Sequence, residues 1–349
     1  MKSASIAALL SLAALSAGTA GTAGAAGKAP VAFSHNDWEL VCDNTRTCRA
    51  AGYQADSGEN QQVSMLITRV AGPSTALDIQ LQIGNDDGVK GPLRFKVGKA
   101  ALSGLDAGTA SLDEGQIRAV LPELLKGDDA TVTANGGKKW TLSLAGLNAV
   151  LLKMDEAQGR VGTPGALVRK GAKPESSVLP PVPMPVVNVA KPPTARPGDD
   201  ALAARIFPSL DLKDALERCN NQDQVNAKSM EVHRLNDRKV LLALGCGVGA
   251  YNYTTLLWTA NDKPPYAPVS LEASGEFDEK DASVTSSMKG RGIGDCWSTE
   301  TWNFNGKDFV RTGATGDGMC RGFAGGAWDL PRYVSRVVVT APAATPSKP

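Results

Sequence analysis

The chain has 349 residues, of which 42% are apolar and 21% are charged, and its 37 basic side chains are balanced by 36 acidic ones. This composition is that of a globular protein, excludes a largely disordered one, and provides enough chain for about two domains. The near-zero net charge argues against binding nucleic acid or anionic lipid by charge alone. The two histidines, His35 and His233, leave little material for a histidine-based metal site or catalytic triad.

Residues 1–26 have the form of a secretory signal peptide. Lys2 precedes an apolar run over residues 6–15, and the small residues that follow include the cleavable pattern Ala23-Gly24-Ala25. The run is shorter than the ~20 apolar residues that span a bilayer, and no later stretch approaches that length. We therefore expect a cleaved signal and a soluble mature protein that is periplasmic or secreted. A retained N-terminal anchor is the alternative.

Because export is predicted, we expect the six cysteines to form disulfides. An even number of cysteines in an exported chain indicates disulfides, although six cysteines allow 15 connectivities. Two cysteines lie before a proline-rich stretch and four lie after it, and nearest-neighbour pairing is our choice. The predicted disulfides are Cys42–Cys48, Cys219–Cys246 and Cys296–Cys320. The competing zinc site requires Cys-x₂₋₄-Cys pairs, which the sequence lacks, so we predict no metal.

Strand patterns dominate residues 27–170, the predicted N-terminal domain. Turn residues at 43–46 separate the first two strands, and Asn135-Gly136 indicates a later hairpin. The pair Ser111 and Glu114 resembles a capping box before a helix ending near Leu125, and a second apolar stripe runs from Leu144 to Met154. The predicted strands cover 38–42, 48–53, 63–70, 77–83, 93–97, 130–134 and 140–142.

Residues 171–200 hold eight of the 21 prolines of the chain. Proline favours extended polyproline II backbone over helix or sheet, so this segment is predicted to be a semi-rigid linker. Its apolar residues could still pack on a neighbouring domain. The last residues, 341–349, are small, contain proline and are predicted to be disordered.

The predicted C-terminal domain covers residues 201–340. Asp211 is a plausible N-cap for a helix through Cys219, and Asn305-Gly306 is the clearest hairpin signal in the chain. Strands are predicted over 230–235, 240–246, 251–259, 302–304, 307–310 and 332–340. Because strands outnumber helices in both halves, the fold class is mainly β or α+β, with two disulfide-stapled β-rich domains joined by a Pro-rich linker.

Several sequence strings resemble known bacterial families. Trp38-Glu-Leu-Val-Cys42, followed by Cys48, resembles the opening of the invasion-associated locus B proteins, which are secreted β-rich domains. Residues 142–147, 154–163 and 166–168, together with Gly294-Asp-Cys296 and Met319-Cys-Arg-Gly322, resemble the periplasmic family of unknown function DUF1176. This resemblance covers nearly all of the mature chain. It implies an exported protein without an assigned activity, and it supplies no catalytic residues.

The familiar catalytic and cofactor motifs are incomplete. The glycines of residues 245–250 fit a dinucleotide-binding pattern, but a β-branched and aromatic stretch follows where a helix is required. Residues 286–289 match Ser-x-x-Lys without its partner motifs, which favours a solvated loop. Paired acids such as Asp86-Asp87 could serve a glycosidase or hold calcium, yet most lie beside glycine or at helix starts, as in turns and caps. We therefore predict no cofactor.

Two groups of residues are candidate binding sites. Gln158 and Arg160 could present a planar polar surface to a carboxylate or a sugar, or could instead close a helix at Gly159. Trp297, Arg321 and Trp328 lie in a stretch rich in glycine, tryptophan and arginine near the third predicted disulfide. Such side chains supply flat stacking surfaces and forked donors. The alternative is that these tryptophans fill a small core.

The sequence favours a non-catalytic binding or structural module of the bacterial envelope. The scarcity of histidine and the absence of a complete nucleophile or metal motif favour binding over catalysis. One alternative is an envelope hydrolase that uses paired carboxylates, and another is an adhesin-like or inhibitor-like module that binds a protein. The expected partner is an envelope ligand or protein of unknown identity, and neither nucleic acid nor a transmembrane segment is expected.

Overall fold

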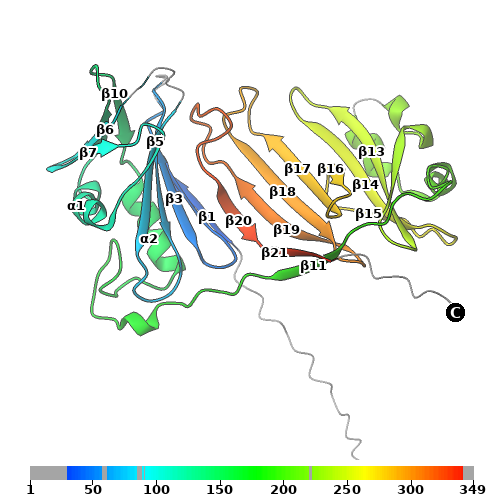
Figure 1. The fold of residues 1–349 in the computed structure, drawn as a ribbon, viewed down its shortest axis with the longest axis horizontal. Coiled ribbons are helices and arrows are strands. Elements are labelled where there is room, and N and C mark those ends of the chain that lie inside the picture. The colour runs from blue at the N-terminus through cyan, green and yellow to red at the C-terminus, as the bar shows by residue number, and fades with distance from the viewer. Residues whose placement is uncertain (1–29, 57–60, 85–88, 90, 220–221, 341–349) are drawn as a thin grey trace, which may run out of the picture.

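The computed structural model describes residues 30–56, 61–84, 89, 91–219 and 222–340. The predicted signal peptide and the predicted disordered tail therefore lie outside the described residues. Within the described residues, strands are the main regular structure, as the sequence patterns predict, and the helices are few and short. Figure 1 shows the N-terminal sheets and the C-terminal sheets side by side along the longest axis of the molecule. Within the described residues, no helix has the length and apolar character needed to cross a membrane.

The N-terminal half consists of two antiparallel sheets and two helices around one core. The core includes Trp38, Phe95 and Trp140, all of which are buried. The six-stranded sheet has the order β1 (Val31–His35), β2 (Trp38–Cys42), β3 (Cys48–Tyr53), β4 (Val63–Arg69), β5 (Leu77–Ile83) and β8 (Thr109–Ser111). The four-stranded sheet has the order β10 (Lys139–Ser143), β9 (Asp129–Thr133), β6 (Leu93–Val97) and β7 (Ala100–Leu105).

The helices α1 (Glu114–Leu124) and α2 (Leu147–Ala157) bury their apolar stripes in this core. The capping box of α1 is formed by Asp113 and Gln116, two residues beyond the pair that the sequence pattern indicated. Asp113 has extended backbone and its carboxylate accepts from the Gln116 amide, which satisfies a backbone donor that the first helical turn leaves free.

Residues 171–200 run in an extended path from the first half to the second. They contain the short 3₁₀ helix η1 (Glu175–Ser177) and the strand β11 (Val186–Ala190). Strand β11 pairs in parallel with β21 (Arg336–Thr340), and Val189 is fully buried against the C-terminal core. Figure 1 shows this segment passing beneath the sheets before it meets β21. The division into two domains joined by a linker remains a prediction.

The C-terminal half has two further antiparallel sheets, which pack through Leu241, Leu257, Val284 and Phe304. The four-stranded sheet contains β12 (Met230–Arg234), β13 (Lys239–Val248), β14 (Tyr253–Asn261) and β15 (Val269–Ser270). The five-stranded sheet contains β16 (Glu276–Asp278), β17 (Ser283–Lys289), β18 (Trp297–Phe304), β19 (Phe309–Gly316) and β20 (Leu330–Val334). Residues 286–289, predicted as a loop, thus lie in β17.

Side chains alternate along β13 and so build two cores from one strand. Val240, Leu242 and Leu244 point to a core that also contains Leu202 and Ile206 of α3 (Leu202–Ile206). Leu241 and Ala243 point the other way, to the five-stranded sheet. The short elements on this side are η2 (Phe207–Ser209), α4 (Lys213–Arg218), η3 (Gln222–Gln224) and η4 (Ala227–Ser229).

Three disulfides are present, and they join the cysteines that nearest-neighbour pairing connects: Cys42–Cys48, Cys219–Cys246 and Cys296–Cys320. The first closes the β2–β3 hairpin, because Cys42 and Cys48 are direct cross-strand partners. Disulfides of this number are typical of proteins from oxidising compartments.

The two halves are held together by a shared apolar cluster. Tyr53 and Leu66 of the six-stranded sheet pack against Phe323, Trp328 and Leu330 of the C-terminal half. Hydrogen bonds surround the cluster, so the contact combines apolar burial with satisfied polar groups.

Candidate functional site

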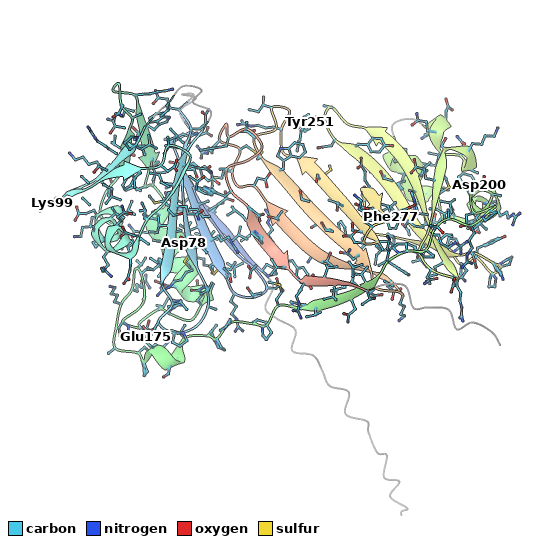
Figure 2. All side chains as sticks on the ribbon, in the orientation of Figure 1. Asp78, Lys99, Glu175, Asp200, Tyr251 and Phe277 are labelled. Atoms are coloured by element: carbon cyan, nitrogen blue, oxygen red, sulfur yellow. A yellow bond between two sulfur atoms is a disulfide. The ribbon has the colours of Figure 1, made fainter. Side chains whose placement is uncertain are left out.

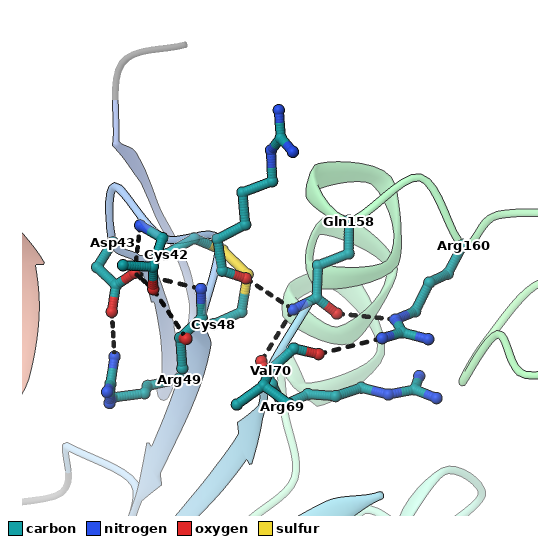
Figure 3. Close-up of a disulfide and its surroundings, with 11 residues drawn as sticks. Cys42, Asp43, Cys48, Arg49, Arg69, Val70, Gln158 and Arg160 are labelled. Carbon is teal, nitrogen blue, oxygen red and sulfur yellow. Dashed lines mark hydrogen bonds and ion pairs between the residues drawn. A yellow bond between two sulfur atoms is a disulfide. The ribbon is translucent and has the colours of Figure 1, made fainter. Parts of the chain in front are cut away.

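Gln158 and Arg160 lie in the interior of the N-terminal half (Figure 3). The Gln158 amide donates to the carbonyls of Arg46 and Arg69 at 2.9 and 2.8 Å, and its oxygen accepts from Nε of Arg160 at 2.8 Å. Arg160 also donates to the carbonyls of Val70 and Gly72. These contacts tie the end of α2 to the end of β4, which is a structural use of both side chains.

Arg321 and Trp328 lie at the contact between the two halves. Arg321 forms an ion pair with Asp37 at 3.0 Å, and its backbone carbonyl accepts from the amide of Gln54 at 2.7 Å. The Trp328 indole donates to Oγ of Ser64 at 2.6 Å, and its side chain is 9% exposed. Both residues therefore use their polar atoms within the chain.

Trp297 lies apart from this contact. Its indole donates to the carbonyl of Gly294 at 3.0 Å, and the Lys289 ammonium lies 5.0 Å from the centre of its ring. The structure thus brings Arg321 and Trp328 to one interface and leaves Trp297 on β18, where it is half-buried. Near it, Asp295 groups with Cys296 and Cys320, but both sulfur atoms are engaged in the third disulfide.

Among the described residues, three carboxyl groups have a raised pKa, and each has different neighbours. Burial raises the pKa of Glu39, which accepts from the Tyr53 hydroxyl at 2.9 Å and from the Met319 amide at 2.6 Å. Burial also raises the pKa of Asp155, which accepts from the amides of residues 167 and 168. The pKa of Asp317 is raised by burial and by the neighbouring Asp329. Glu39 and Asp155 thus bind backbone amides of other segments of the chain, whereas Asp317 has a second carboxylate, Asp329, beside it.

A groove lies on the inner face of the five-stranded sheet in the C-terminal half. It consists of two cavities of about 600 and 260 Å³, and Glu300 lines both. We call this pair of cavities the sheet groove. The larger cavity is lined by Ser270, Leu271, Glu272, Ala273, Glu300, Trp302, Phe309 and Arg311. The smaller is lined by Ser286, Met288, Ser298, Glu300, Ala314, Thr315 and Arg332.

The register of the sheet explains where the groove lies. Ser298, Glu300 and Trp302 alternate along β18 and share a face. Ser286 and Ala314 are the cross-strand neighbours of Glu300. Because serine and alanine are short, they leave space on either side of the Glu300 carboxylate, and the sheet is hollowed there.

The charged centre of the groove is the pair formed by Glu300 and Arg311. Their closest oxygen and nitrogen atoms are 3.6 Å apart, and their side chains are 44% and 47% exposed. The Arg311 guanidinium also lies 5.4 Å from the centre of the Tyr333 ring. Arg311 is therefore held from two sides, while its N–H donors form no hydrogen bond within the described part of the chain. A guanidinium held in this way is preorganised to bind a ligand.

A second cavity of the C-terminal half, about 540 Å³, lies beside His233. His233 contacts the carboxylates of Glu231 and Glu279 at 3.4 and 3.3 Å, and the centre of its ring lies 5.0 Å from that of Phe277, with the two ring planes tilted by 48°. Phe277 is labelled in Figure 2, on β16. His233 thus already has carboxylate and aromatic neighbours, so this cavity offers less free binding chemistry than the sheet groove.

The sequence did not indicate the groove as a binding site. Ser286 and Met288 belong to the Ser-x-x-Lys match at residues 286–289, which was interpreted as a loop. One signal was available, because the alternation Ser298-x-Glu300-x-Trp302 places a carboxylate on the same strand face as an aromatic ring. The partner Arg311 follows from the hairpin at Asn305-Gly306, but the cross-strand neighbour of a residue depends on register, and a bulge interrupts this pairing.

A family model described as "Protein of unknown function (DUF1176)" matches residues 32–335. The chain belongs to this family. A relative from Escherichia coli (strain K12), described as "Uncharacterized protein YpfG", is 31% identical over 315 residues, which cover 80% of this chain and 86% of the relative.

A solved structure, that of invasion associated protein B from Bartonella henselae, also matches. It covers 37% of this chain and 99% of its own chain at 16% identity, with a TM-score of 0.29. This is the type of protein that the opening strands of the sequence resemble, and at this score we draw nothing further from the match.

Proposed function

We propose that this DUF1176 protein is an exported, non-catalytic binding module of the bacterial envelope, and that the sheet groove is its binding surface. The observation that carries the proposal is the half-exposed guanidinium of Arg311 in the groove, which lies beside the Glu300 carboxylate and near the Tyr333 ring. Cavities of several hundred Å³ with a few convergent polar groups are typical of ligand sites.

The proposal of export rests on the signal-like residues 1–26 and on the three disulfides. The proposal of binding without catalysis rests on the groove chemistry. Its central carboxylate is paired with an arginine, and the carboxyl groups with raised pKa lie elsewhere. A hydrolase with paired carboxylates would instead place an acid with a raised pKa opposite a second carboxylate in the groove. Asp317 has such a neighbour in Asp329, but neither residue lines the groove.

A groove-blocking variant tests this proposal. Ser286 lines the smaller cavity and Ser287, its neighbour on β17, points to the opposite face of the sheet. The disulfide-intact mature chain is immobilised and incubated with an osmotic-shock extract, and retained material is identified by mass spectrometry. Ser286→Trp should abolish retention that Ser287→Trp preserves. Equal retention by both variants would contradict the groove as the binding surface.

A further inference from the structure

We propose that the ligand of the sheet groove is a neutral glycan, a chain of hexopyranose rings with free neighbouring hydroxyl groups. This inference rests on the proposed function and adds the chemical class of the ligand. Four features of the groove support it: its charge balance, the geometry of its ion pair, its aromatic side chains and the state of its backbone.

The charges that line the groove balance one another. Glu272 and Glu300 are matched by Arg311 and Arg332. A groove of one sign would attract a polyanion or a polycation, because charges of one sign sum to a field that extends over the surface. A balanced groove gives no such preference and fits a ligand that is polar but uncharged.

The ion pair at the centre presents acceptors and donors side by side. The Glu300 carboxylate accepts hydrogen bonds, and the Arg311 guanidinium donates several in a planar fork. Two neighbouring sugar hydroxyl groups match this arrangement, because one hydroxyl can donate to the carboxylate while the other accepts from the guanidinium. The serine hydroxyls of Ser286 and Ser298 offer further contacts within the smaller cavity.

Aromatic rings lie next to these polar groups. Trp302 is the cross-strand neighbour of Arg311, and Phe309 lies on the same face of β19 as Arg311. Both rings are half-buried, so part of each remains at the groove surface. The face of a pyranose ring presents polarised C–H groups, which pack well on the electron-rich face of an aromatic ring.

The backbone along the centre of the groove is already paired. Strand β18, which carries Ser298, Glu300 and Trp302, is hydrogen-bonded to β17 on one side and to β19 on the other. An extended peptide that adds a strand to a sheet needs a free edge, and the groove lies on the face. Recognition must therefore come from side chains, which favours a glycan over a peptide bound in the extended form.

The test is a calorimetric titration of the full mature chain, with its disulfides intact, with the soluble probe cellotetraose. Glu300→Gln keeps the size of the side chain and removes its charge, and we expect the affinity to fall about tenfold or more because hydrogen bonds to charged groups are the stronger ones. The matched control is Glu276→Gln, which changes an exposed carboxylate in the cavity beside His233, outside the sheet groove, and should leave the affinity unchanged. A second pair compares Trp302→Phe with Trp297→Phe, since Trp297 lies on the opposite face of β18.

The outcomes separate this inference from the proposed function. A loss of cellotetraose binding in Glu300→Gln and Trp302→Phe, with both controls unchanged, supports the glycan. Absence of cellotetraose binding by the wild-type chain, or equal binding by all variants, overturns it. A third outcome is that Ser286→Trp abolishes retention of extract material, while the wild-type chain binds neither cellotetraose nor an uncharged, end-blocked Ser-Ala hexapeptide. In that case the glycan assignment fails and the proposed function of the groove stands.

Discussion

Replacing Trp328 with alanine tests whether the two halves of the protein are packed against each other. The side chain is 9% exposed and lies in a cluster with Tyr53, Leu66 and Phe323. Removing a buried tryptophan costs about 3–5 kcal/mol, because burial is lost and a cavity remains. We therefore expect Trp328→Ala to lower the free energy of unfolding by that amount.

The substitution Trp328→Phe separates packing from hydrogen bonding. It keeps an aromatic ring in the cluster and removes the indole donor to Oγ of Ser64. Ser64 still donates to the carbonyl of Gly52 at 2.8 Å, so its hydroxyl keeps a partner. The expected loss is about 1–2 kcal/mol, from one net hydrogen bond and a slightly smaller ring.

Urea unfolding followed by circular dichroism, at constant pH and with the disulfides intact, measures both variants. Trp297→Ala is the control, because this half-buried ring should cost about half as much as a fully buried one. A loss below about 1 kcal/mol for Trp328→Ala would refute the packed interface. If ligand capture were lost at unchanged stability, Trp328 would instead belong to a binding site, as the sequence also allowed.

Three further predictions concern charges and disulfides. Nε of Arg234 donates to the buried Asp199 carboxylate at 2.9 Å. Arg234→Met leaves this carboxylate without its cation and should lower the free energy of unfolding by about 3–5 kcal/mol in urea titrations. A loss below about 1 kcal/mol would show that the pair is dispensable. Burial raises the pKa of Glu39 above its ordinary value of 4.5. Between 4.5 and this raised pKa the native state keeps a proton that the unfolded state releases, so the free energy of unfolding falls as the pH rises through that range. Glu39→Gln should remove that fall, which stability measurements from pH 4 to 7 would detect as a gain relative to the wild type, whereas parallel pH profiles would contradict it. The double variant Cys219→Ser, Cys246→Ser should lose about 3–4 kcal/mol in thermal or urea unfolding, from the opened loop between cysteines 27 residues apart, and an unchanged midpoint would contradict that contribution.

The strands with clear alternation could be predicted to the residue. β5 and β6 begin and end where the alternating pattern places them. β2 and β3 also match the prediction, although both of their faces are largely buried, because the turn residues at 43–46 mark the end of one strand and the start of the next. The disulfide pairing also followed from the sequence, since cysteines close in the chain are easily brought together by a hairpin.

The elements that the sequence did not reveal depend on partners far away in the chain. β11 lies among prolines and forms only because β21, some 150 residues later, pairs with it. β17 is rich in serine, and it forms a strand because β16 and β18 pair with it on its two sides. The sheet groove is of the same kind, because the position of Arg311 beside Glu300 depends on the register of two strands and on a bulge between them.

Site-specific photo-crosslinking in the envelope of living bacteria tests the groove as the binding surface most directly. A benzophenone amino acid is placed at Ser298, which lines the groove, or at Thr299, the next residue on β18, which points to the other face. We predict a crosslinked product, identified by mass spectrometry of the purified chain, for position 298 and not for position 299. Equal products at both positions, or a product at 299 alone, would contradict the groove as the site at which this protein binds its ligand.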